Sequence, residues 1–91
     1  MEISVAVPTL LRDAAGGQSE FQIEAATLDE ALQRMRERYP LLRIHLYEET
    51  GRLRPHVLIF YNEQSIAWLD HLNQPLQPGD HLDILQAVSG G

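Results

Sequence analysis

The sequence predicts an α+β domain in which one helix covers one face of a single mixed sheet. Three observations predict it: alternating apolar residues near both ends of the chain, one helical stripe of apolar residues, and a strongly apolar strand at residues 56–61. The predicted order is two strands, a helix, a strand, a short strand and a last strand. Because packing the helix stripe onto one sheet buries all these apolar faces together, we expect four to five strands and one main helix.

The first two predicted strands form a hairpin. Residues 1–8 alternate apolar side chains with small or polar ones, which is the period of a half-buried strand, and residues 21–25 repeat this pattern. Pro8 marks the end of the first strand. Residues 9–19 include two adjacent glycines and are predicted to form a long turn.

The main helix begins at a capping signal. Thr27 and Glu30 form a capping box, in which each side chain satisfies free amide groups of the first turn. Pro40 ends the helix. We interpret residues 41–53 as a loop, with one helical turn as the alternative. The stripe that faces the sheet has helical spacing: Leu28, Ala31, Leu32, Met35 and Tyr39.

The strongest predicted strand is residues 56–61, which is rich in β-branched and aromatic side chains. Residues 64–66 are predicted to form a short edge strand. Leu76 is expected to close the core. Three apolar residues between these segments are predicted to lie in a loop: Trp68, Leu69 and Leu72.

The last strand follows a tight turn. Residues 77–80 read Gln-Pro-Gly-Asp, which is typical of a type II turn because proline fixes its first central φ and glycine supplies a positive second φ. Residues 81–88 then form the last strand, with Leu82 and Ile84 directed inward. The length of 91 residues corresponds to one domain, which we place at residues 1–87, followed by a flexible tail at 88–91.

Composition limits the possible partners and compartments. The net charge of −6 disfavours binding to the nucleic-acid backbone and favours an electropositive protein partner. No apolar run approaches the roughly 20 residues that span a bilayer, and no secretory signal is visible, so we expect no membrane association and a cytoplasmic location.

Side-chain chemistry indicates neither a metal site nor a catalytic site. The four histidines have spacings that match no zinc motif, and the chain has no cysteine, so we expect no metal site. No serine or threonine has an evident general base, so we predict no catalytic residue and no bound cofactor.

The terminal diglycine is the candidate reactive group. Gly90 and Gly91 add almost no bulk, which suits a tail threaded into a narrow channel together with Val88 and Ser89. The group delivered is the carboxylate of Gly91. The alternative is an inert terminus. Because the chain contains no lysine and no cysteine, only its N-terminal amine could intercept an activated Gly91.

Several motifs together resemble the ubiquitin-like sulfur-carrier family of ThiS and MoaD. They are the order of elements, the strand ending at Tyr61-Asn62-Glu63, the turn at residues 76–80 and the diglycine ending at a fixed distance from that turn. Residues 5–12, followed by Gly16-Gly17-Gln18, are most similar to the CysO branch, which serves cysteine biosynthesis.

The resemblance implies a β-grasp fold whose last strand lies centrally beside the first and third strands. It also implies that an E1-like enzyme uses ATP to adenylate the carboxylate of Gly91, and that sulfur then replaces AMP to give a thiocarboxylate. In the CysO branch the acceptor would be an activated serine on a pyridoxal-phosphate cysteine synthase, with proteolytic release by a metalloprotease.

An apolar patch is predicted as the partner interface. Alternation directs Leu58 and Phe60 away from the core, and Leu85 likewise. If the third and last strands are neighbours, as the family implies, these residues form one exposed patch, which is typical of an interface. In the alternative they pack under the loop at 63–75, against Trp68. Smaller residues along the edge of the predicted patch are Ala6, Pro8 and Ala87.

Three functions remain open from the sequence. The first is sulfur carriage, in which the receiving pathway could be that of cysteine, molybdopterin, thiamin or a thioacid secondary metabolite. The second is a protein modifier joined through Gly91 to a lysine of a target. The third is a β-grasp interaction module with an unreactive tail.

Overall fold

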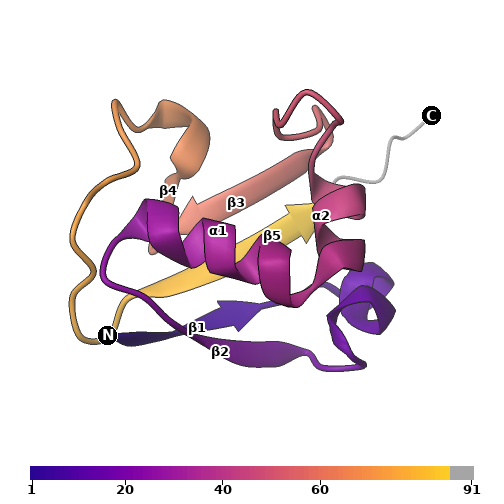
Figure 1. Ribbon diagram of the computed structural model, residues 1–91, viewed down its shortest axis with the longest axis horizontal. Helices are drawn as coiled ribbons and strands as arrows, with labels where there is room; N and C mark the ends of the chain where they lie inside the picture. Colours follow the sequence, from indigo (N-terminus) through magenta and orange to yellow (C-terminus); the bar gives the residue numbers. More distant parts are fainter. Residues whose placement is uncertain (87–91) are drawn as a thin grey trace.

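The computed structural model describes residues 1–86. Five strands form one sheet in the order β2-β1-β5-β3-β4, and α1 lies across one face of it (Figure 1). The neighbours β1 (Glu2–Ala6) and β5 (His81–Gln86) run parallel, and the other neighbouring strands run antiparallel. This mixed sheet with one main helix confirms the predicted α+β, β-grasp fold and the central place of the last strand.

The predicted hairpin of β1 and β2 (Glu20–Glu24) is confirmed, with Val5 paired to Phe21 on the buried side. The predicted long turn at 9–19 is wrong in part, because residues Thr9–Ala15 form a 3-10 helix, η1. Its apolar residues Leu11, Ala14 and Ala15 are buried, and this apolar face is what holds the segment in a helical conformation.

The main helix α1 (Leu28–Arg38) begins as predicted. The Glu30 amide donates to Thr27 Oγ1 at 3.2 Å, and the Ala26 amide donates to Glu30 Oε1 at 2.9 Å. The predicted stripe faces the sheet, and four of its members are buried: Leu28, Ala31, Leu32 and Met35.

The prediction of a loop at 41–53 is wrong for its first part, because a second helix, α2 (Pro40–Leu46), follows α1 almost directly. Pro40 ends α1 and is also tolerated in the first turn of α2, where its missing amide would have no helical partner. Leu42 and Leu46 lie one turn apart and are fully buried. Their burial stabilises a helix that is too short to form alone.

The strand β3 (Val57–Tyr61) and the edge strand β4 (Gln64–Ser65) confirm the strands predicted at 56–61 and 64–66. Trp68 was predicted in a loop, but it belongs to a short 3-10 helix, η2 (Ile66–Trp68). Ser65 Oγ starts this turn by accepting from the Ala67 amide at 3.3 Å.

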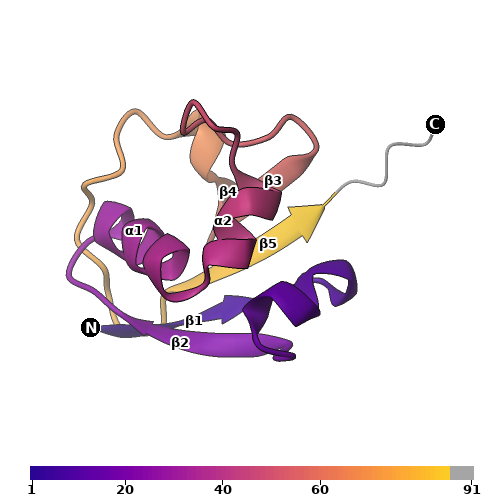
Figure 2. The same ribbon diagram turned by 45° about the vertical axis from the view of Figure 1, so that its right-hand side comes forward.

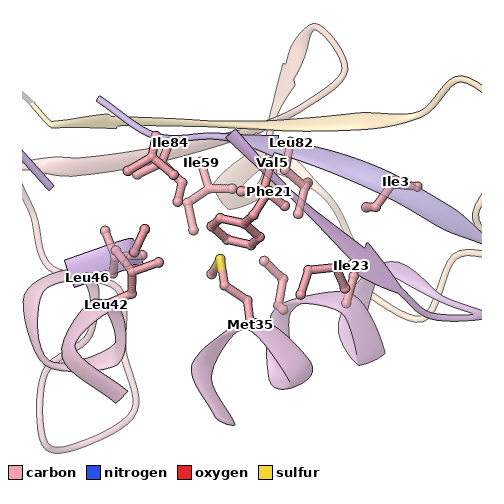
Figure 3. Close-up of a cluster of buried hydrophobic side chains, with 14 of the residues drawn as sticks. Ile3, Val5, Phe21, Ile23, Met35, Leu42, Leu46, Ile59, Leu82 and Ile84 are labelled. Carbon is pink, nitrogen blue, oxygen red and sulfur yellow. The ribbon is translucent and has the colours of Figure 1, made fainter. Parts of the chain in front are cut away.

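The core lies between the sheet and the two helices. Figure 3 shows Leu82 and Ile59 of the sheet directed toward the helices, with Met35 of α1 and Leu42 of α2 on the opposite side of the core. Leu76 is 6% exposed and closes the core as predicted. The turn before β5 also forms as predicted: the Asp80 amide donates to the Gln77 carbonyl at 3.1 Å, and Gly79 has a φ of 88°.

Candidate functional site

The central strand β5 leads to the predicted reactive terminus. It lies between β1 and β3: its residues 81–83 pair with β1, and its residues 82–86 pair with β3. Leu82 and Ile84 beneath it are at most 2% exposed. The strand ends at Gln86, at one end of the sheet (Figure 2). β5 is therefore a firmly held base for the residues beyond it. The predicted tail residues and Ala87 lie outside the described residues: Ala87, Val88, Ser89, Gly90 and Gly91.

The structure brings the predicted interface residues of β3 and β5 together on the sheet face opposite α1. Leu58 and Leu85 are direct partners across the two strands, and they are 41% and 47% exposed. Phe60 is half-buried. With Ala6 and Pro8, Phe60 and Leu85 line an open hollow of about 440 Å³. These five residues are called the outer-face patch below: Ala6, Pro8, Leu58, Phe60 and Leu85.

The loop at 63–75 leaves most of this patch uncovered. Leu58 and Leu85 remain exposed, and Trp68 is itself 80% exposed, so its indole buries little of any neighbour. The alternative of a covered patch therefore does not hold for Leu58 and Leu85. Phe60, Ala6 and Pro8 are half-buried.

A cluster of hydrogen bonds fixes the start of β5 to the end of β3. Asp80 accepts from the Tyr61 hydroxyl at 2.5 Å, from Asn62 Nδ2 at 3.1 Å and from the Gln77 amide at 2.8 Å. Asn62 Oδ1 in turn accepts from the His81 amide at 3.0 Å. These residues are called the Asp80 cluster below. The sequence suggested only a turn residue at Asp80, because its side-chain partners Tyr61 and Asn62 lie 19 and 18 positions away.

The surroundings of the Asp80 cluster keep the Asp80 carboxyl ionised and the Tyr61 hydroxyl protonated. Burial raises the pKa of the Asp80 carboxyl, but the hydrogen bonds from Tyr61, Gln77 and Asn62 outweigh it and hold that pKa below its ordinary value of 3.8. Burial, followed by the hydrogen bond and charge of Asp80, raises the pKa of Tyr61 to about 12. At neutral pH Asp80 is therefore an anionic acceptor and Tyr61 a protonated donor.

Two further observations concern the described part of the chain. No group of three or more His, Cys, Asp or Glu side chains within residues 1–86 could hold a metal ion. Neither α1 nor any other helix in this range is long and apolar enough to cross a membrane.

The chain is similar to known carriers and modifiers over its full length. It is 29% identical to the sulfur carrier protein CysO of Mycobacterium tuberculosis over 93 aligned residues, which cover all of both chains. A chain of the Amycolatopsis orientalis BexX/CysO complex is 28% identical, with a TM-score of 0.79 and coverage of 98% of this chain and 99% of that chain. The small archaeal modifier protein 1 of Methanosarcina acetivorans is also 28% identical, with a TM-score of 0.79 and coverage of 99% and 96%.

The five-stranded mixed sheet, its single main helix and its central last strand define a protein of the ubiquitin-like β-grasp class. Within that class the ThiS family matches residues 5–91, and the chain belongs to the ThiS family. Members of this family are sulfur carriers and not enzymes, and they bind no cofactor. The CysO chain of the BexX/CysO complex, to which this chain is similar, was solved together with a partner protein.

Proposed function

We propose that this chain carries sulfur as a thiocarboxylate on Gly91. The observation that supports this most is the extent of the family match, which runs through the terminal diglycine to residue 91. The pairing of β5 with β3 as far as Gln86 adds physical support, since a held strand gives the residues after Gln86 a fixed point of departure.

The chemistry begins at an unreactive group. A carboxylate resists nucleophiles because it is anionic and would have to expel oxide. In the proposed reaction an E1-like partner joins the Gly91 carboxylate to the α-phosphate of ATP and releases pyrophosphate. Sulfide at the HS⁻ level, delivered by that partner, then attacks the acyl carbon; the new C–S bond replaces the C–O bond to AMP, AMP leaves, and loss of the thioacid proton gives the thiocarboxylate. The use of ATP is well suited to the cytoplasm, which we propose as the location.

The chain itself contributes docking and delivery. We propose that the outer-face patch binds the partner enzymes, because exposed apolar surface is typical of an interface. Asp83 pairs with both Ala6 and Phe60, so one acidic side chain lies among the apolar ones. Val88, Ser89 and Gly90 would thread into the partner, and the two glycines would let the narrowest part of a channel close around the backbone.

Cysteine biosynthesis is the pathway that we favour for the sulfur. The support is the 29% identity to CysO carriers over the whole of both chains. The acceptor would then be an activated serine on a pyridoxal-phosphate cysteine synthase, and a metalloprotease would release the product. Delivery to molybdopterin, thiamin or a thioacid metabolite would use the same loaded Gly91.

A protein modifier is the second candidate function. It is favoured by the similarity to small archaeal modifier protein 1, which is 28% identical over nearly the full length of both chains. In that case the activated Gly91 would form an amide with a lysine of a target. The chain contains no lysine, so it could not be such a target through a side chain of its own. A β-grasp interaction module with an unreactive Gly91 is the third candidate.

Mass spectrometry of the intact chain separates these candidates. The chain is co-expressed with the E1-like enzyme of its own genome, and we expect one terminal oxygen to be replaced by sulfur. Conjugates joined through Gly91 would instead favour the modifier, and an unmodified chain would favour the unreactive module. One alanine added after Gly91 serves as the control, because it should abolish loading and leave the thermal unfolding curve unchanged.

A further inference from the structure

The exposed apolar side chains are unevenly distributed over the molecule. Seven large apolar residues are exposed within residues 1–86, and Leu58 and Leu85 of the outer-face patch are two of them. Three others come from η1 and α2, and the patch does not include them: Leu10 at 71%, Leu41 at 56% and Ile44 at 49% exposed. These three residues are called the helix-side strip below.

The elements that carry the strip pack on each other and lie at the end of the sheet where β5 ends (Figures 1 and 2). On α2, Leu42 and Leu46 face the core, whereas Leu41 and Ile44 are three positions apart and share the opposite side. Exposed apolar residues are therefore present on both sides of the sheet near the point where β5 ends: the outer-face patch on one side and the helix-side strip on the other.

The short distance from the end of β5 to Gly91 determines which surfaces an activating enzyme can contact. Five residues follow Gln86, the last of them Gly91, and even fully extended they span at most about 18 Å. An enzyme that encloses the Gly91 carboxylate away from water must therefore approach the end of the sheet closely. Its surface around the channel mouth would meet whatever flanks β5.

We infer that the helix-side strip is a second contact surface for the enzyme that activates Gly91, and that it docks against an apolar rim at the mouth of that enzyme's channel. The inference rests on the proposed function and adds a contact on the opposite side of the sheet from the outer-face patch. Two contacts on opposite sides of β5 would fix the direction in which the tail enters. The last two residues are glycines and offer no side chain of their own that could set this direction.

Enzyme kinetics with the full chain test the inference. Pyrophosphate exchange by the E1-like enzyme of the same genome is measured against the concentration of the carrier. In the double variant L41S/I44S we expect KM for the carrier to rise on the order of tenfold with kcat nearly unchanged, since about 1.4 kcal/mol of docking energy would be lost. The variant L10S tests the strip from a different element. The matched control is W68S, which removes an exposed apolar side chain from η2.

The possible outcomes separate the inference from the proposed function. If L41S/I44S and L10S both match W68S in KM while Leu85→Ala raises it, the enzyme contacts only the outer-face patch and the inference is wrong. Sedimentation of the same samples shows whether the strip instead joins two copies of the chain. Loss of self-association with an unchanged KM would also overturn the inference. A wild-type chain that the enzyme does not adenylate would overturn the proposed function together with it.

Discussion

The two faces of the sheet differ in what their side chains can do. On the face toward the helices, Val5, Ile59 and Leu82 are at most 1% exposed. On the opposite face the β1–β2 half carries exposed glutamates, whereas the β3–β5 half carries the exposed pair Leu58 and Leu85. One face is thus largely apolar and buried. The other has an acidic β1–β2 half, and its β3–β5 half combines exposed apolar side chains with Asp83.

The buried face contains the residues that specify the fold, and the exposed face contains residues that remain available for recognition. Burying an apolar side chain contributes about 1.5–3 kcal/mol to folding, and residues that stay exposed forgo much of that gain. Leu58 and Leu85 therefore keep apolar surface that a partner can still bury. The neighbouring glutamates would add attraction for an electropositive partner and would raise its association rate, in line with the net charge of −6.

The largest change in folding stability is expected at Ile59 of β3, and a much smaller one at its neighbour Leu58. Ile59→Ala removes a side chain with 0% exposure, so we expect a loss of about 2–5 kcal/mol in the free energy of unfolding, including the cost of the cavity. Leu58→Ala on the opposite face should cost less than about 1 kcal/mol. Urea denaturation of both variants measures the difference, and equal losses would mean that the outer face also contributes to the core.

Residues whose patterns extend over many positions made the fold predictable. The alternation in β1 and β2, the stripe of α1 and the turn before β5 each involve several residues, and the tertiary contacts of those residues favour the same local structure. The short elements were missed because their signals cover a single turn. In α2 the pair Leu42 and Leu46 is the only apolar repeat that faces the core, and in η1 the adjacent glycines of the same segment favoured a turn.

The candidate site was predictable only where the alternation within a single strand fixes the direction of a side chain. Alternation alone placed Leu58 and Leu85 on one face, and their direct pairing then followed from the family's strand order. The Asp80 cluster was not predictable, because Asp80 meets Tyr61 and Asn62 only once β3 and β5 pair, and no local pattern encodes that contact. The helix-side strip depends on α2 and η1, which the sequence did not reveal.

The next largest effect concerns the hydrogen bonds that anchor the start of β5 to the end of β3. Asp80→Asn removes the charge that accepts from Tyr61, Asn62 and the Gln77 amide, so we expect a loss of about 1–3 kcal/mol in the free energy of unfolding at neutral pH. Tyr61→Phe removes one donor and should cost less. Thermal unfolding of both variants beside the wild type provides the measurement.

The pH dependence of the Asp80 cluster follows from the two pKa shifts. The folded-state pKa of Asp80 is lowered, so its contribution is present above 3.8 and is lost as the pH falls through the folded value. The pKa of Tyr61 is raised from 10.0 to about 12, so its contribution is present below 10.0 and is lost as the pH rises toward about 12. The stability difference between wild type and Asp80→Asn should therefore shrink at both extremes. A difference that stays constant with pH would refute the ionic character of the cluster.

The smallest expected effect tests whether the β3–β5 half of the outer face acts as one surface. Leu85→Ala should weaken binding to the activating enzyme by about 1–2 kcal/mol, because an exposed apolar residue that a partner buries can be a hot spot, and it should change folding stability little. Leu58 pairs directly with Leu85, so the double variant should lose less than the sum of the two single losses. Isothermal titration of the four proteins gives this coupling. Strictly additive losses would show that the partner contacts the two leucines independently, and unchanged affinity in all variants would exclude the outer-face patch as the docking surface.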